Sequence, residues 1–133
     1  MAREDRGEAV LKFEEATARL REGVRQAQDE LDKDGVIQRF EFTFELFWKA
    51  LKIYFENEGI LCKTPRECLK AAFRYEIVQD ELLYVSMLED RNKTSHIYGK
   101  EESERIFQKI KSHYVSAFEK VVDILSKKTR SEK

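Results

Sequence analysis

Apolar residues recur at every third or fourth position along most of this chain. The first run consists of Val10, Phe13, Thr17, Leu20, Val24, Ala27 and Leu31, with Thr17 counted for its methyl group. This spacing places the side chains on one face of an α-helix, whereas a half-buried strand would alternate at every second position. The sequence therefore predicts a long amphipathic helix over residues 10–31.

A second run with the same spacing begins after Asp34-Gly35, where we expect the first helix to end. Its members are Ile37, Phe40, Phe44, Phe47, Trp48, Leu51 and Phe55, and the helix is predicted to stop at Glu58-Gly59. The aromatic residues of this run follow core spacing, which favours packing over a base-stacking platform. Phe42, Leu46 and Ile53 lie off the main stripe. A helix that is apolar on two sides is either central in its bundle or shared with a second subunit, and both alternatives stay open.

Three further helices are expected downstream. Thr64, Pro65 and Glu67 form a helix-start pattern, which predicts a short helix to about Tyr75. Asp80 can cap the next helix, which runs out at residues 90–92. The last helix is expected to begin at about residue 100 and to carry an apolar stripe of Ile106 or Phe107, Ile110, Tyr114, Ala117, Val121 and Leu125.

The whole pattern predicts an all-α fold, an antiparallel up-and-down four-helix bundle with one short additional helix. The chain of 133 residues has five Gly and one Pro, too few turn formers for a sandwich or barrel. We expect a single helical domain over residues 1–133, with its core at about residues 8–125 and a frayed tail at 126–133.

Charge and cysteine content narrow the function classes. Lys and Arg number 25 and Asp and Glu 26, so the chain lacks the basic excess of a protein that coats nucleic acid or an anionic membrane, and any nucleic-acid contact must be local. No apolar run approaches the ~20 residues that span a bilayer, which favours a cytoplasmic protein without a membrane partner. The six-residue spacing of Cys62 and Cys68 matches neither a zinc knuckle nor a redox pair, so we expect reduced thiols.

Common enzyme signatures are missing from the sequence. It contains no Gly-rich phosphate loop, no G-x-S-x-G elbow and no H-E-x-x-H pair, so no cofactor is expected. His96 and His113 are the two histidines, and neither has a nearby Cys in sequence, so no metal site is expected. His113 adjoins Tyr114 on the last helix, where packing or solvent exposure is the simpler interpretation.

The candidate site is the polar segment of residues 90–98, which lies between two apolar helices. Arg91 offers planar paired donors for a phosphate, and His96 can exchange a proton near neutral pH. These are the two capacities that metal-independent RNA cleavage requires, and a symmetric dimer would supply two copies of each. The simpler alternative is an ordinary polar helix connection, in which Arg91 complements a helix C-terminus.

The same segment resembles the HEPN superfamily. Arg91 and His96 are separated by four residues, and Tyr98 completes the R-x4-H-x-Y form of HEPN proteins that pair with minimal nucleotidyltransferases in toxin and antitoxin systems. Residues 34–49 (DGVIQRFEFTFELFWK) and residues 87–92 (MLEDRN) are similar to the branch called nucleotidyltransferase substrate-binding proteins. The similarity extends from about residue 8 to residue 125.

The resemblance implies a role for each motif residue. Arg91 and His96 would be the ribonuclease pair, Asn92 would orient the site, and Tyr98 would be the hydroxyl to which the partner transfers AMP. An adenylate there would add bulk and negative charge beside the two cations and could block RNA.

The resulting hypothesis is a toxin subunit that acts as a metal-independent endoribonuclease on RNA rather than DNA. It would be a homodimer, able to enter a heterotetramer, that a separate minimal nucleotidyltransferase binds and neutralises; the chain is not itself a nucleotidyltransferase. The alternatives are a non-enzymatic substrate-binding or accessory subunit of a two-component nucleotidyltransferase, and a purely structural helical dimer.

Overall fold

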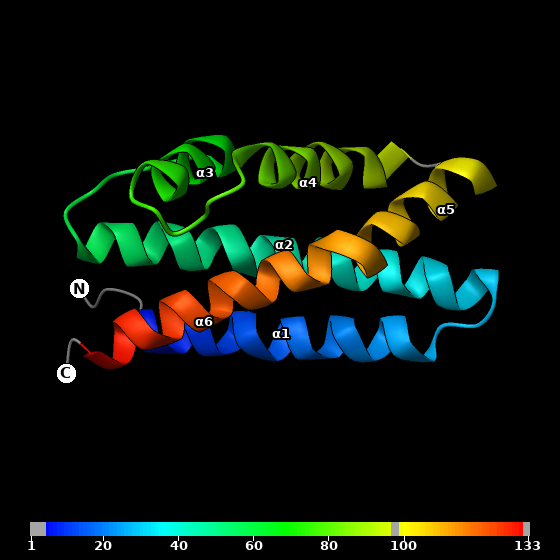
Figure 1. Ribbon diagram of the computed structural model, residues 1–133, viewed down its shortest axis with the longest axis horizontal. Coiled ribbons are helices and arrows are strands. Elements are labelled where there is room, and N and C mark those ends of the chain that lie inside the picture. The colour runs from blue at the N-terminus through cyan, green and yellow to red at the C-terminus, as the bar shows by residue number, and fades with distance from the viewer. Residues whose placement is uncertain (1–4, 97–98, 132–133) are drawn as a thin grey trace.

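The computed structural model describes residues 5–96 and 99–131, and within these ranges it contains helices and no strands (Figure 1). The elements in order are α1 (Arg6–Gln26), α2 (Glu30–Asn57), α3 (Pro65–Arg74), α4 (Glu81–Lys93), the 3-10 turn η1 (Thr94–His96), α5 (Lys100–Lys109), the π-helical turn η2 (Ile110–Tyr114) and α6 (Val115–Ser131). The prediction of an all-α bundle with a short additional helix is confirmed.

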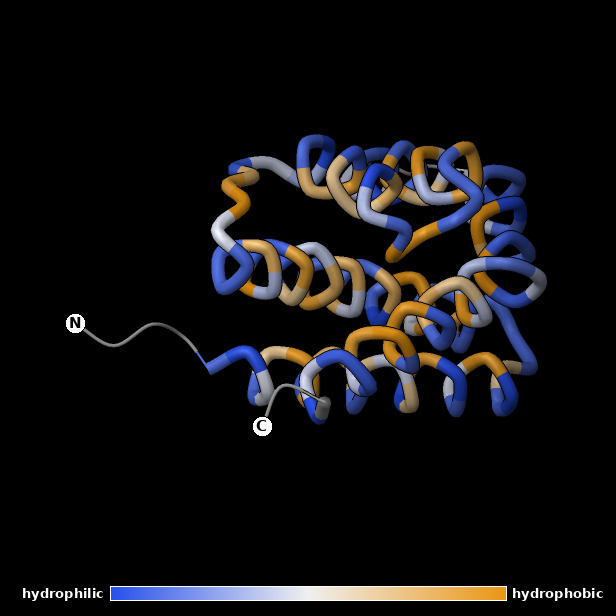
Figure 2. Tube along the Cα trace, turned by 60° about the vertical axis from the view of Figure 1, so that its left-hand side comes forward, coloured by the Kyte–Doolittle hydropathy of each residue, from blue (hydrophilic) through white to orange (hydrophobic). Residues whose placement is uncertain are grey.

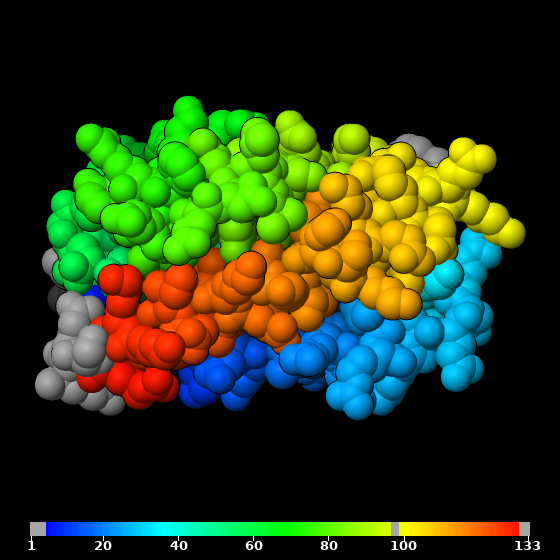
Figure 3. Space-filling model, in the orientation of Figure 1, coloured from blue at the N-terminus to red at the C-terminus, as the bar shows by residue number. Residues whose placement is uncertain are grey.

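The helices pack around α2. Helix α1 lies along α2, α6 packs on α1, and α3 and α4 together cover another side of α2. Helices α5 and α6 run diagonally across one face of the molecule, between α4 and α1 (Figures 1 and 3). The end of α4 and the start of α5 lie at one end of the bundle, and residues 90–96 of the polar segment lie there.

The predicted boundary between the first two helices is wrong. Helix α1 ends at Gln26, and α2 begins at Glu30 with Asp29 as its N-cap and with a capping box between Asp29 and Asp32. Asp34 and Gly35 therefore lie inside α2. A glycine inside a helix costs roughly 0.5–1 kcal/mol relative to alanine, a penalty small enough for the cap and the packing of the rest of α2 to outweigh.

The core is rich in aromatic rings. Phe47 is fully buried, and the centre of its ring lies 5.5 Å from that of Phe13 and 5.3 Å from that of Phe118. Phe40 and Phe44 are also fully buried, which confirms core packing for the stripe of α2. Hydrophobic and hydrophilic stretches alternate turn by turn along the helices (Figure 2).

The three apolar residues off the main stripe of α2 have different environments. Ile53 is buried, Leu46 is partly buried against the core, and Phe42 stays 62% exposed. Most of the second apolar side is thus used within the chain. Phe42 alone of the three remains largely available to another molecule.

The expectation of reduced thiols is wrong, because Cys62 and Cys68 form a disulfide. Both residues are buried, and the bond ties the segment after α2 to the first turns of α3. Sequence spacing could not reveal this pairing, which depends on the turn at Thr64 bringing the two residues together. Disulfides are rare in reducing cytosols, with intracellular proteins of hyperthermophiles as a known exception.

Helix α6 continues to Ser131, through most of the stretch that we expected to be a frayed tail. None of the helices in the described part of the chain is both long and apolar enough to cross a membrane.

Candidate functional site

Helix α4 positions the polar segment. Its first turn is capped by Asp80, whose Oδ1 accepts a hydrogen bond from the backbone N–H of Leu83. Its last turn carries Arg91, and the chain continues directly into η1. The Thr94 hydroxyl lies 2.7 Å from Oε2 of Glu41 on α2 and 2.6 Å from the carbonyl oxygen of Arg91. The start of η1 is therefore attached to both α4 and α2.

Arg91 is held by a carboxylate of α2. Its Nη2 donates to Oε2 of Glu45 at 2.8 Å, and both side chains are 36% exposed. Its Nη1 lies 3.5 Å from Oδ1 of Asn92, which is at the long limit for a hydrogen bond. An ion pair this exposed contributes about 0–1 kcal/mol, so a phosphate could compete with Glu45 for the guanidinium.

His96 lies in a different place from Arg91. It lines a shallow cleft of about 670 Å³ together with Glu89, Asn92, Lys93 and Glu102, and its side chain is exposed. Arg91 is not among the lining residues of this cleft. The structure thus brings His96 and Asn92 together, but it turns Arg91 toward α2. Tyr98 lies outside the described residues.

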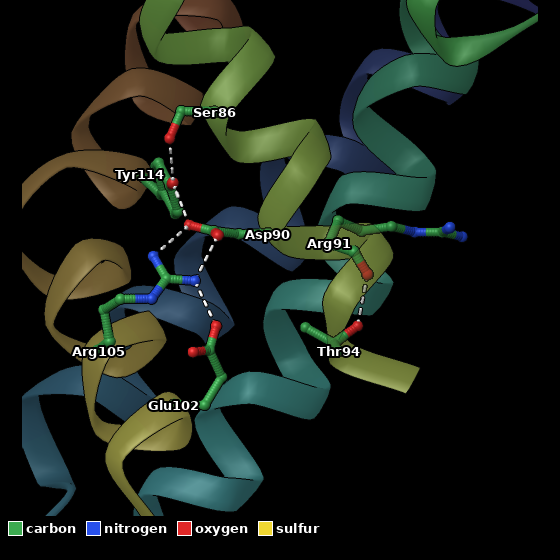
Figure 4. A network of polar contacts seen from close by, with 7 residues as sticks. All are labelled: Ser86, Asp90, Arg91, Thr94, Glu102, Arg105 and Tyr114. Carbon is green, nitrogen blue, oxygen red and sulfur yellow. Dashed lines mark hydrogen bonds and ion pairs between the residues drawn. The ribbon is translucent and has the colours of Figure 1, made fainter. Parts of the chain in front are cut away.

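A buried carboxylate next to Arg91 anchors the end of α4 (Figure 4). Asp90 is 3% exposed, and its Oδ1 accepts from Nη2 of Arg105 on α5 at 2.7 Å. Its Oδ2 accepts from the Tyr114 hydroxyl at 2.5 Å, and that hydroxyl lies 3.0 Å from Oγ of Ser86. One carboxylate therefore joins α4, α5 and η2.

The network extends into the cleft of His96 through Glu102. Nη2 of Arg105 also donates to Oε1 of Glu102 at 2.7 Å, and this bond lowers the pKa of Glu102. Hydrogen bonds to Asp90 and then to Glu102 raise the pKa of Arg105, and burial raises that of Tyr114. At neutral pH Glu102 is thus a carboxylate, Arg105 is a cation and Tyr114 is a neutral donor.

Sequence reasoning missed these supporting residues. The pattern makes Asp90 part of a helix end and Tyr114 one more apolar position of the last helix. Arg105 and Glu102 carry no motif, and the buried partner of Arg105, Asp90, lies fifteen positions away in sequence. The one available signal was Tyr114, because a hydroxyl on a core stripe usually has a hydrogen-bond partner.

Residues 5–96 and 99–131 contain no group of three or more His, Cys, Asp and Glu side chains arranged to hold a metal ion. The cations of the site are instead side chains, Arg91 and Lys93 at the end of α4 and Arg105 on α5.

Fold and site together define a class of protein: an all-α bundle that presents Arg91, Asn92 and His96 where its fourth helix meets its fifth. A family model described as nucleotidyltransferase substrate binding protein like matches residues 8–127. The chain belongs to this family, and the HEPN resemblance drawn from the sequence is confirmed.

Comparison with known proteins found similar chains among the curated proteins and among the solved structures. The probable ribonuclease HepT of Haemophilus influenzae is 30% identical over 81 residues, which are 57% of this chain and 56% of that protein. The match thus spans little more than half of the length of this curated relative. A crystal structure of a protein from Thermus thermophilus is similar with a TM-score of 0.79 and 33% identity, covering 85% of this chain and 98% of that one.

Proposed function

We propose that this protein is a HEPN-type toxin subunit that cleaves RNA without a metal ion. The observation that carries the proposal is the exposed cleft lined by His96 and Asn92, which lies at the same end of α4 as Arg91. The similarity to a probable ribonuclease supports the same activity class. We also propose a cytoplasmic location, because a ribonuclease of this kind would meet its RNA substrate inside the cell.

The reaction is a transfer within the RNA strand. A base removes the proton of a ribose 2′-hydroxyl, and the oxygen forms a bond to the adjacent phosphorus. The bond from phosphorus to the 5′-oxygen breaks, and an acid protonates that leaving oxygen. His96 exchanges these protons, while Arg91 stabilises the charge of the phosphorane and Asn92 orients the site.

A homodimer completes this chemistry. One chain supplies one His96, yet the reaction needs a base and an acid, and in the isolated chain Arg91 turns away from the cleft of His96. A second copy related by a two-fold axis would place its own Arg91 and His96 opposite the first pair. We propose that this dimer binds the nucleotidyltransferase partner as a heterotetramer.

Cleavage of RNA in the presence of a chelator tests the proposal. The purified protein is expected to cut single-stranded RNA in EDTA and to leave 2′,3′-cyclic phosphate ends, identified by mass spectrometry. A matched oligonucleotide with 2′-deoxyribose at the cleaved position should resist, because the attacking oxygen is missing. Intact RNA after prolonged incubation with a folded, dimeric sample would contradict the proposal.

A second candidate function rests on the Glu45–Arg91 pair. The guanidinium of Arg91, which would bind a phosphate during catalysis, is already paired with Glu45. This pairing is expected of a site that binds or presents a ligand without cleaving it. The protein would then be a non-enzymatic substrate-binding subunit of a two-component nucleotidyltransferase, which agrees with the description of its family. In that case the protein alone would not cut RNA, and the complex with its partner would transfer nucleotide to a bound substrate.

Tyr98 is the proposed control point. We expect a minimal nucleotidyltransferase to transfer AMP from ATP to it: the phenolic oxygen bonds to the α-phosphorus, pyrophosphate leaves, and the phenolic proton is lost. Incubation with that partner and ATP should raise the intact mass by one adenylate, and Tyr98→Phe should abolish the increase. Tyr75→Phe, at the exposed tyrosine that follows the last residue of α3, serves as the control. An adenylate that persists in Tyr98→Phe would show that another residue is the acceptor.

A further inference from the structure

The outer face of α3 carries a line of positive charge. Arg66, Lys70 and Arg74 are exposed and are spaced four residues apart, so they project from the same side of the helix. Lys63 precedes the helix and is also exposed. Among the residues that the structure describes, none of these four side chains takes part in an ion pair, although the chain as a whole is balanced in charge. We call Lys63, Arg66, Lys70 and Arg74 the basic stripe.

The fold fixes the direction of the basic stripe. Cys68, Leu69 and Ala72 are buried on the opposite side of α3, which packs against α2 and α4. The disulfide of Cys62 and Cys68 ties the start of the helix to the preceding segment. The basic stripe therefore faces solvent in a fixed orientation, and the green segment that contains α3 lies at the upper left of the molecular surface in Figure 3.

Two aromatic side chains accompany these cations. Phe73 is 44% exposed and Tyr75 is 47% exposed, and the guanidinium carbon of Arg74 lies 6.0 Å from the centre of the Tyr75 ring. The one acidic residue within α3, Glu67, uses its Oε1 to accept the backbone N–H of Lys63 at 2.8 Å. The surface thus combines cations with exposed aromatic rings. The acidic residue of α3 is bound to the backbone at the start of the helix.

We infer that the basic stripe with Phe73 is a docking surface for single-stranded RNA, separate from the cleft of His96. Cations along one line attract successive phosphates, and an exposed ring beside them offers a face on which any base can stack. This inference rests on the proposed ribonuclease function and adds the surface that holds the substrate. It also provides the local positive patch that a chain of net charge -1 needs in order to bind RNA.

The position of the basic stripe suits this role. Helix α3 packs against α4, and α4 leads from there to the polar segment. Since α4 has 13 residues, it spans roughly 20 Å between its start, which follows α3, and the polar segment. RNA held at the basic stripe would thereby be tethered near the cleft, which raises its effective concentration there.

Binding of a fluorescent single-stranded RNA tests the inference. The measurement uses the full chain with His96→Ala so that the RNA stays intact, and anisotropy gives Kd at several salt concentrations. The triple variant Arg66→Gln, Lys70→Gln and Arg74→Gln should raise Kd at least about tenfold and should reduce the slope of log Kd against log salt by about 2, since each phosphate contact on a single strand contributes ~0.7. Phe73→Ala should also raise Kd about tenfold, but with the slope unchanged, because stacking releases no counterions.

The control loses the same charge elsewhere. Lys49, Lys111 and Lys120 are exposed and lie on α2, η2 and α6. Replacing all three by Gln should leave Kd and its salt slope nearly as in the parent. The inference is overturned if the triple variant of the basic stripe binds RNA like this control. It is also overturned if the parent binds no RNA and the triple variant no longer binds the nucleotidyltransferase. The basic stripe would then be a protein-binding surface. RNA that binds at the basic stripe but is never cleaved by the native protein would support the inference while the proposed ribonuclease function fails.

Discussion

Replacement of His96 by alanine is expected to slow RNA cleavage by roughly a hundredfold to ten-thousandfold, the usual contribution of a positioned acid–base group. His96 is exposed at the cleft beside Asn92, and no other histidine lines that cleft to take over proton exchange. Because its side chain lies at the surface, the variant should keep its fold. Initial rates of cleavage of a short RNA by the parent protein and by the variant measure the effect.

The other histidine is the matched control. His113 lies in η2 and lines a separate cleft with Asp80, Lys120 and Asp123, away from the polar segment. His113→Ala should therefore cleave at the rate of the parent protein. Equal rates for the parent and for His96→Ala would rule out His96 as the acid–base group.

Replacement of Asp90 by asparagine is expected to reduce the free energy of unfolding by about 2 kcal/mol. Both carboxylate oxygens of Asp90 accept hydrogen bonds, one from Arg105 and one from Tyr114. In asparagine one of these oxygens becomes an NH2 group, which would face the N–H of Arg105 or the O–H of Tyr114 with no acceptor between them. Asp90 is also nearly fully buried, so water cannot repair the mismatch. Urea unfolding followed by circular dichroism measures the change. Cleavage should fall as well, since the end of α4 carries Arg91.

Glu102→Gln provides the comparison for Asp90→Asn. It removes a carboxylate from the same Arg105, but at a site that is 41% exposed. Water can replace this partner, so the stability should change little. A loss of stability in Glu102→Gln as large as that in Asp90→Asn would contradict the assignment of Asp90 as the anchor.

Most of the fold follows from local patterns. The apolar stripes of α2 and α6 and the start of α3 at Thr64 were readable because spacing and caps act over a few residues. The predicted boundary between α1 and α2 was wrong because the apolar spacing continues by coincidence across the connection between these helices. Ala27 is the C-cap of α1, and Leu31 is 79% exposed on α2. The Asp29 capping box was a stronger signal than Gly35, which a helix interior tolerates.

The site was predictable in its residues but not in its arrangement. Spacing and resemblance single out Arg91 and His96, yet local sequence cannot show that Arg91 turns to Glu45, because that ion pair joins residues on two helices. The basic stripe was overlooked for another reason. Net charge averages over the whole chain, so a balanced total hid three cations on one side of α3.

The π-helical turn η2 has a consequence for comparing this chain with its relatives. One additional residue in a helical turn rotates everything before it by about 100° relative to everything after it. Helix α6 can therefore direct Phe118 into the aromatic core while α5 directs Arg105 at Asp90, although the two helices run on as one. A relative without this insertion must place its cation at another position to reach the same carboxylate. An ungapped alignment across residues 110–114 would then pair Arg105 with the wrong residue.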